Sequence, residues 1–305
     1  MRAKLGVLGV ALLLTIAGCA GSGSASGEGG VVVTTNILGD LTEAVVGDQV
    51  PVTVLMKPNA DPHSFAISAQ EAAQLEQADL VVHNGLGLEE GVQRNVDAAE
   101  ESGVPTLAVG DQVDPISYRD NESAGEPDPH FWTDPRRVHT AVELIADQVV
   151  SEVDGVDEET TRANARAYLA EVEELDGWMA DQFAAIPEQD RKLVTNHHVF
   201  GYLAQRYEFE VLGAVLPSGT TLASPSASDL SELAGTIRKA GVAAIFADSS
   251  QPDRLAKVLA EQAGLEVRVL SLYSESLTGP EGSASTYLDM MRVNTTTIAD
   301  GLSRN

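Results

Sequence analysis

Short apolar runs alternate with amphipathic stretches along the chain from residue 31 onward. Runs of β-branched residues predict strands, and apolar residues three and four positions apart predict helices. The expected strands are 31–36, 52–56, 80–83, 106–109, 192–195, 210–215, 242–247 and 267–272. The expected helices are 38–46, 68–77, 88–101, a segment from Pro135 onward, 157–186, 200–206, 227–239, 254–262 and 285–302. This alternation in both halves predicts an α/β fold with two lobes, each with a mainly parallel sheet flanked by helices.

One segment between the two halves is unusually long. From Asp157 it meets no proline before Pro187, and its apolar residues recur at helical spacing: Tyr168, Val172, Leu175, Met179, Phe183 and Ile186. At 1.5 Å per residue, such a helix would reach roughly 45 Å. A helix of this length is expected to join the lobes as a rigid spine.

The first thirty residues predict export. Arg2 and Lys4 precede an almost wholly apolar stretch at 6–16, which is typical of a secretory signal and too short for a permanent membrane span. Small residues lead to Cys19, as in bacterial lipoproteins, whose thiol is lipidated at the cleavage point. The alternative is an ordinary signal peptide that happens to contain a cysteine. A stretch rich in Gly and Ser follows and is expected to form a flexible tether.

These observations divide the chain into five expected segments. They are a lipoprotein signal peptide at 1–18, a tether at 19–30, an N-terminal α/β lobe at 31–154, a linker helix at 155–187 and a C-terminal α/β lobe at 188–305. The protein is expected outside the cytoplasm, anchored to the cell membrane by a lipid on Cys19.

Composition excludes several function classes. The formal charge of −27 argues against nucleic-acid binding, and an aromatic content of 5% argues against the aromatic-lined cleft of a sugar receptor. A hydrophobic content of 43% is typical of a folded globule. Much of the acidity is therefore interpreted as a solvated surface that keeps an exported protein soluble.

Three of the six histidines stand where an expected strand gives way to a loop or helix. His63 and His130 each close an Asp-Pro-His triplet, and His197 follows the strand expected at 192–195. Proline restricts its own backbone and that of the preceding residue, so each triplet should present its imidazole from a stiff turn. Imidazole is the commonest protein ligand for transition metals, and ligand sites gather at the carboxyl ends of parallel strands. The three side chains are therefore candidate ligands of one metal ion.

Four motifs resemble those of the zinc- and manganese-binding solute-binding lipoproteins of ATP-driven metal importers. They are Asp-Pro-His-Ser-Phe at 61–65, Asp-Pro-His-Phe-Trp-Thr-Asp-Pro at 128–135, Asn-His-His-Val-Phe-Gly-Tyr at 196–202 and Thr-Tyr-Leu-Asp-Met-Met at 286–291. The resemblance extends from Val31 to about Ser303. It implies two lobes bridged by a rigid helix, with His63 and His130 contributed by the first lobe and His197 by the second.

The resemblance also implies a fourth ligand, a carboxylate in a late loop of the second lobe. The family usually has aspartate in an Asp-Ser-Leu context, whereas this chain has Glu275 before Ser-Leu. Asp248, at the end of the preceding expected strand, is the second candidate for this ligand. Asp134 either orients an imidazole or caps the helix that Pro135 opens. His198 is interpreted as a supporting group or a bystander beside the ligand His197.

Three imidazoles and one carboxylate suit tetrahedral Zn²⁺, with bonds of about 2.0–2.2 Å. Mn²⁺ prefers more oxygen, and the resemblance implies that manganese receptors carry a carboxylate where this chain has His197. Zinc is therefore the expected transported ligand, with manganese or iron as the alternative. Many zinc receptors also carry a His-rich loop, but the segment at 117–128 contains acids and no histidine.

The resemblance implies a binding protein and no enzyme, with the membrane permease of an ABC importer as its partner. A metallochaperone that delivers the metal stays open as a second partner, and the protein is expected to act as a monomer. Two other classes remain as alternatives. A zinc hydrolase would also use three histidines but needs an open position for water, and an adhesin would bind its partner without metal.

Overall fold

The computed structural model describes residues 29–118, 123–264 and 267–303. The expected signal peptide, most of the tether and Cys19 lie outside these residues. No helix in the described ranges combines the length and apolar character needed to cross a membrane. The strands are β1 (Val31–Val33), β2 (Val52–Val54), β3 (Leu80–His83), β4 (Thr106–Ala108), β5 (Lys192–Thr195), β6 (Glu210–Ala214), β7 (Ala244–Asp248) and β8 (Arg268–Leu272).

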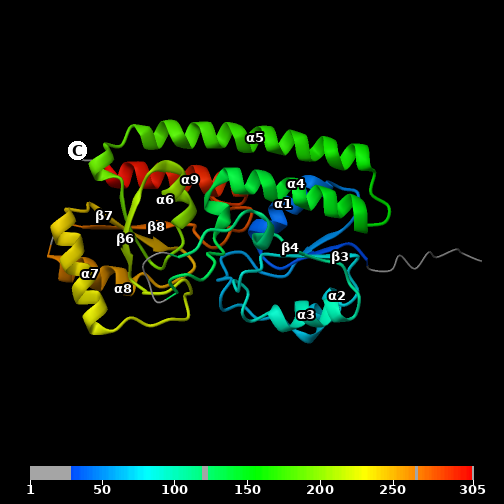
Figure 1. Ribbon diagram of the computed structural model, residues 1–305, viewed down its shortest axis with the longest axis horizontal. Helices are drawn as coiled ribbons and strands as arrows, with labels where there is room; N and C mark the ends of the chain where they lie inside the picture. The colour runs from blue at the N-terminus through cyan, green and yellow to red at the C-terminus, as the bar shows by residue number, and fades with distance from the viewer. Residues whose placement is uncertain (1–28, 119–122, 265–266, 304–305) are drawn as a thin grey trace, which may run out of the picture.

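Helices flank the strands, as the alternating pattern predicts (Figure 1). They are α1 (Asn36–Val46), α2 (Ala69–Leu75), α3 (Gln93–Glu101), α4 (Pro135–Glu152), α5 (Glu158–Ala184), α6 (Gly201–Tyr207), α7 (Ala227–Ala240), α8 (Arg254–Ala263) and α9 (Tyr287–Leu302). Short 3-10 turns occur at Gly110–Gln112, Phe131–Thr133 and Glu188–Asp190.

The strands form two separate parallel sheets of four strands each, which confirms the predicted fold class. Their orders are β2-β1-β3-β4 and β6-β5-β7-β8, so the two sheets share one topology. In each sheet the chain crosses from one side of the first strand to the other. The carboxyl ends at this reversal form the crevice in which ligands of such sheets bind. We retain the proposed division into a first lobe at 31–154 and a second lobe at 188–305.

Helices cover both faces of each sheet, because successive strand residues are buried alternately on one face and on the other. Val31 and Val33 of β1 pack into the core beneath α1 and α4, whereas Val32 packs into a second cluster beneath α2 and α3. Successive residues of a strand point to opposite faces, so an unbroken valine run indicates a strand buried on both sides.

The long helix α5 runs along both lobes (Figure 1). It has 27 residues, and the side chain of Asp157 accepts a hydrogen bond from the Thr160 N–H at its start. At 1.5 Å per residue its length is about 40 Å. Most of the predicted apolar stripe is fully buried, from Val172 to Phe183. Phe183 meets the rings of the second lobe's Tyr207 and Phe209, each at a centroid distance of 5.0 Å.

Two predicted boundaries lie three or more residues from those observed, and the others lie within two. The first strand ends at Val33, because Thr35 already serves as the extended residue before α1. The helix expected to begin at residue 88 begins at Gln93. Glu89 instead turns its carboxylate back onto the backbone N–H groups of Asn84 and Gly85, at 2.6 and 3.2 Å, which stabilises a turn ahead of the helix.

Candidate metal centre

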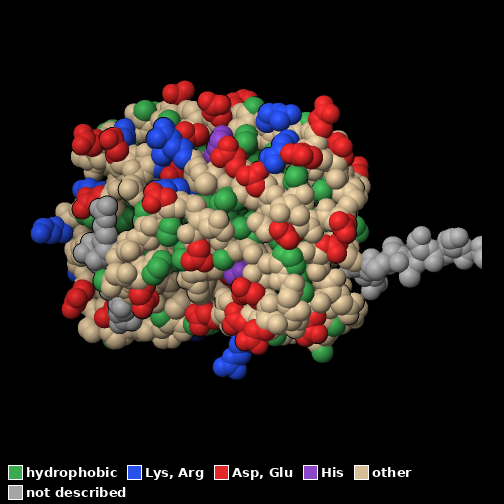
Figure 2. All heavy atoms as spheres, turned by 45° about the vertical axis from the view of Figure 1, so that its right-hand side comes forward, with side chains coloured by type: hydrophobic (Ala, Val, Ile, Leu, Met, Phe, Trp, Pro, Cys, Tyr) green, Lys and Arg blue, Asp and Glu red, His purple; other side chains and the backbone are tan. Residues whose placement is uncertain are grey.

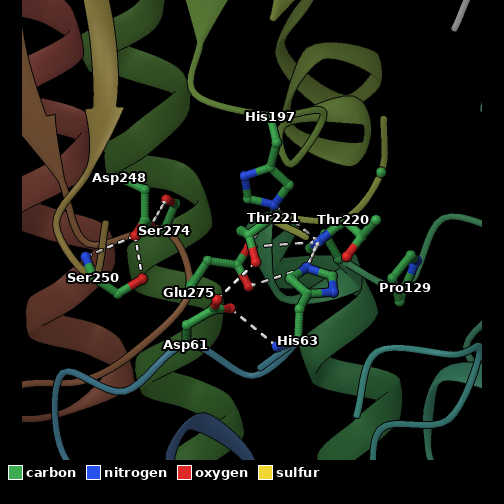
Figure 3. Close-up of polar contacts among 12 residues, drawn as sticks. Asp61, His63, Pro129, His197, Thr220, Thr221, Asp248, Ser250, Ser274 and Glu275 are labelled. Atoms are coloured by element: carbon green, nitrogen blue, oxygen red, sulfur yellow. Dashed lines mark hydrogen bonds and ion pairs between the residues drawn. The ribbon is translucent and has the colours of Figure 1, made fainter. Parts of the chain in front are cut away.

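Four side chains from widely separated segments converge between the two sheets. His63, His130, His197 and Glu275 each offer one ligand atom, and these atoms all lie within 4.8 Å of one another. The Nε2 atom of His130 is 3.4 Å from the Nε2 atoms of both other histidines. Figure 3 shows the Glu275 carboxylate pointing toward the imidazoles of His63 and His197. The structure thus brings together the four residues that the sequence analysis placed first.

The carboxylate makes close contacts with all three rings. Its Oε1 atom lies 3.1 Å from His197 Nε2 and 3.4 Å from His130 Nε2, and its Oε2 atom lies 3.7 Å from His63 Nε2. Neither oxygen has a hydrogen-bond partner among the described residues. Lone pairs of neutral imidazoles and of a carboxylate therefore face one another. A shared proton or a cation must lie between such groups, since buried polar atoms require a partner.

The surroundings keep the imidazoles neutral. All four residues are at most 2% exposed. Burial lowers the pKa of His130 well below its ordinary value, lowers that of His197, and lowers that of His63 to about 2. The neighbouring histidines lower the His63 pKa further. Neutral imidazole is the form that binds a metal, so these rings are prepared for coordination.

The pKa of Glu275 is shifted in the opposite direction. Burial raises it well above the ordinary value, and the charges of Asp248, Asp61 and Asp128 raise it further. In the metal-free protein this carboxyl group therefore retains a proton at pH values where an exposed glutamate has lost it. A divalent cation bound at the four ligand atoms would displace that proton and leave the carboxylate as an anionic ligand.

The two Asp-Pro-His triplets adopt the same local structure. In the first, Asp61 Oδ1 accepts a hydrogen bond from the His63 N–H at 3.0 Å. In the second, Asp128 Oδ1 accepts from the His130 N–H, also at 3.0 Å. An aspartate that caps the N–H two residues later forms a tight local turn. The motif therefore fixes the backbone turn from which each imidazole projects.

Asp128 also orients the ring of His130. Its Oδ1 atom lies 2.7 Å from His130 Nδ1, so the Nδ1–H donates to the carboxylate and the Nε2 lone pair faces the other ligands. Carboxylates that hold a metal-binding histidine in this way fix its tautomer and raise its basicity. The Tyr118 hydroxyl lies 3.2 Å from the same Nδ1 atom and closes this side of the ring.

The remaining candidates lie outside the four-residue cluster. Asp248, the second candidate for the fourth ligand, accepts hydrogen bonds from the Ser250 N–H at 2.7 Å and from the hydroxyls of Ser250 and Ser274. Figure 3 shows its carboxylate on the side away from the imidazoles. Asp134 accepts from the Arg136 N–H at 2.9 Å, so it caps α4. His198 is half-buried, and its N–H donates to the Ser218 carbonyl.

The last two histidines are also outside the cluster. His83 is buried at the end of β3, and His139 lies on α4 with its side chain 44% exposed, 3.5 Å from Glu143. The sequence analysis gave no supporting role to Asp61, Asp128 or Asn36. The repeated Asp-Pro-His triplets could have indicated the first two. Asn36 carried no signal, because its partners in the Glu275 loop are 240 and 241 residues away.

Known proteins provide an independent comparison. The family described as Zinc-uptake complex component A periplasmic matches residues 31–301. The manganese-binding lipoprotein MntA of Halalkalibacterium halodurans is 29% identical over 299 residues, which is 96% of each chain. The iron-binding protein YfeA of Yersinia pestis is 28% identical over 271 residues, which is 89% of this chain and 85% of that protein. The solved structure of the periplasmic zinc-binding protein TroA from Treponema pallidum is 28% identical and superposes with a TM-score of 0.83, covering 90% of this chain and 99% of that chain.

Proposed function

Since the chain belongs to the Zinc-uptake complex component A periplasmic family, we infer that it is the metal-binding, substrate-binding component of an ABC importer. We further propose that its cargo is Zn²⁺, bound by His63, His130, His197 and Glu275. The protein captures the ion between its lobes and delivers it to the membrane permease.

The ligand geometry carries the proposal of zinc. Tetrahedral Zn²⁺ with bonds of about 2.0–2.1 Å keeps neighbouring ligand atoms about 3.3 Å apart. The closest contacts around His130, His197 and Glu275 measure 3.1, 3.4 and 3.4 Å. His63 Nε2 lies 3.4 Å from His130 Nε2 and 3.7 Å from Glu275 Oε2, and all four ligand atoms lie within 4.8 Å of one another, so the set needs a modest contraction to enclose a tetrahedral ion. Because Glu275 supplies the fourth ligand, no position is kept for a catalytic water, and the hydrolase alternative loses its main support.

Manganese and iron are the alternatives within the same function. MntA is named for manganese and YfeA for iron. Mn²⁺ lies at the weak end of the Irving–Williams order and prefers oxygen ligands, so a site with three imidazoles should bind it less tightly than Zn²⁺. Iron(II) stands next to manganese in that order and is expected to bind with similar weakness.

Elemental analysis of the purified protein, followed by competitive titration of the stripped form, tests the cargo. One zinc per chain is expected, and Mn²⁺ or Fe²⁺ in large excess should fail to displace it. Equal or stronger binding of manganese would overturn zinc as the cargo and leave the importer function intact. Failure to bind any divalent metal would overturn the function itself.

We propose that the protein works outside the cytoplasm on a lipid anchor. MntA is named a lipoprotein, and Cys19 stands in a lipoprotein-like context in this sequence. The partner is the permease, the protein acts as a monomer, and a metallochaperone remains a second partner to be sought. A Cys19→Ser variant should be released from membranes into the soluble fraction. Retention of this variant at the membrane would contradict the anchor.

A further inference from the structure

The loop that carries Glu275 follows β8 of the second lobe, but residues of the first lobe hold its C-terminal part. Asn36, at the start of α1, is 8% exposed and reaches across the lobe boundary. Its Oδ1 atom accepts from the Leu277 N–H at 2.9 Å, and its Nδ2 atom donates to Ser276 Oγ at 2.8 Å. One amide therefore fixes the two residues that immediately follow the candidate ligand.

Two further first-lobe groups hold the same loop. The indole N–H of Trp132 donates to the Ser274 carbonyl at 2.9 Å. The backbone N–H of Asn59 donates to the Leu277 carbonyl, also at 2.9 Å. First-lobe donors and acceptors thus lie on both sides of Glu275. Buried hydrogen bonds of this kind resist separation, because breaking one leaves an unpaired polar group.

The second lobe holds the loop on its N-terminal side. Asn294 of α9 accepts from the Tyr273 N–H and donates to the Tyr273 carbonyl, each at 2.9 Å. The Ser274 hydroxyl donates to Asp248 at the end of β7. Tyr273 is therefore bonded to the second lobe, and Ser274 is bonded to both lobes, through its hydroxyl to Asp248 and through its carbonyl to Trp132.

The backbone of His197 is held by partners in the second lobe. Its carbonyl accepts from Thr195 Oγ1 at 2.7 Å, and the neighbouring His198 N–H donates to Ser218. The Leu216 N–H donates to the Asn196 carbonyl at 2.8 Å. All of these partners belong to the second lobe, so this ligand is mounted on β5 and its neighbours.

We propose that Asn36 is a positioning residue that fixes the Glu275 loop to the first lobe. This inference rests on the proposed function, and it specifies which of the four ligands move together. Glu275 stays with His63 and His130 when the site opens through a local movement of its loops, and His197 is the ligand that leaves. The ion is then held by two nitrogens and one carboxylate, an incomplete set from which it dissociates more readily.

Zinc dissociation from the loaded full-length protein into excess chelator tests this assignment. Asn36→Ala should speed dissociation by about tenfold, which corresponds to about 1.4 kcal/mol, because Glu275 is no longer held in place. Asn294→Ala is the matched control, since it removes a buried asparagine that binds the same loop from the second lobe. It should change the rate by no more than about twofold.

A mutant cycle separates positioning from a general loss of structure. Asn36→Ala should weaken equilibrium zinc binding in the wild-type background but add nothing to Glu275→Gln, because both changes act through one carboxylate. If Asn36→Ala does not fold, as judged by circular dichroism of the metal-free protein, the same cycle is run with Trp132→Phe. That variant removes the indole donor to Ser274.

The outcomes are distinct. Faster release from Asn36→Ala alone, with its effect absent in Glu275→Gln, supports the proposal. An unchanged rate in Asn36→Ala, an equal or larger effect of Asn294→Ala, or additive effects with Glu275→Gln would overturn it. These comparisons apply once the wild-type protein has been shown to bind zinc. An inability of the wild type to bind zinc contradicts the proposed function instead.

Discussion

At the residue scale, the site depends on neutral nitrogen ligands paired with a protonated carboxyl group. Burial opposes charge on every member, so the metal-free site lowers its histidine pKa values and raises that of Glu275. A divalent ion reverses this, because it restores the carboxylate and accepts the lone pairs of all three rings. The local aspartates, Asp61 and Asp128, fix the backbone turns that carry the two first-lobe imidazoles.

Substitution of single ligands should abolish stabilisation by zinc. At a zinc concentration of about a hundred times the dissociation constant, the wild-type protein should gain about 2.7 kcal/mol of unfolding free energy. His63→Ala and His130→Ala should lose most of this gain, measured as the shift of the thermal midpoint on adding zinc. His139→Ala is the control, because the His139 side chain is 44% exposed on α4, and this variant should retain the full shift. A lost shift in His139→Ala would place the binding site elsewhere.

Zinc affinity should rise with pH with a slope of about one proton per ion. In the metal-free protein the three imidazoles have lowered pKa values and stay neutral as the pH falls below 6.5, so they contribute little competition. Glu275 has a raised pKa and is protonated from its ordinary value of 4.5 up to the raised value. Over that window, binding must release its proton, and each unit of decreasing pH weakens binding by about tenfold.

Competitive titration at several pH values, with the chelator calibrated at each, measures this slope. The buried site assigns the pH dependence to the Glu275 carboxyl group rather than to the histidines. A slope near three would mean that the imidazoles are protonated in the metal-free protein. In Glu275→Gln the slope should fall toward zero, because the amide carries no titratable proton.

At the element scale, α5 connects the lobes. Asp176, near its middle, accepts hydrogen bonds from Arg206 at 2.6 and 3.1 Å and from the Tyr207 hydroxyl at 2.7 Å, both on α6. The same carboxylate lies 3.6 Å from Arg136 on α4. One helix position thus contacts helices of both lobes. Together with the buried apolar stripe of α5 from Val172 to Phe183, this contact limits how far the lobes can rotate apart.

Truncation of the buried stripe should destabilise the whole protein. Leu175 is fully buried on α5, so Leu175→Ala should lower the free energy of unfolding by about 2–5 kcal/mol through lost burial and a residual cavity. Glu174→Ala, on the exposed face of the same turn, should change it by no more than about 0.5 kcal/mol. Urea unfolding of the metal-free variants gives both values. Equal effects of the two substitutions would show that the stripe contributes little.

At the scale of the whole molecule, all four candidate ligands follow strands of the two sheets. His197 comes directly after β5 and Glu275 after β8, while His63 and His130 lie in loops beyond β2 and β4. The carboxyl ends of both sheets therefore supply one centre. Acidic side chains are spread over the face seen in Figure 2, with few Lys or Arg, as the net charge of −27 requires. This distribution agrees with the interpretation of the acidity as a solvated surface.

Metal binding should change the shape of the molecule very little. A spine of 27 residues packed on helices of both lobes resists large hinge closure, so the response is expected in loops around the centre. Small-angle scattering should give the same radius of gyration with and without zinc. Hydrogen exchange should slow in the segments around His197 and Glu275. A resolvable decrease in radius of gyration on adding zinc would contradict a rigid spine.

The sequence by itself determined the fold class, the mainly parallel sheets and the long helix. These follow from local patterns, namely valine runs such as 31–33 and the apolar stripe from Val172 to Phe183, which require burial whatever their partners. It also indicated the three histidines, because Asp-Pro-His triplets carry His63 and His130 and because His197 follows an expected strand. Glu275 was proposed from resemblance alone, with Asp248 left as a competitor.

Only the tertiary structure placed Glu275, rather than Asp248, beside the three imidazoles and attached the Glu275 loop to the opposite lobe. Asn36 and Leu277 form one hydrogen bond but stand 241 residues apart, and no periodicity or motif connects them. Hydrogen bonds between distant segments depend on how whole lobes pack, which local sequence does not specify. The same packing buries the four candidate ligands away from water. This burial raises the pKa of Glu275, so Glu275 is the residue whose proton a metal ion would displace.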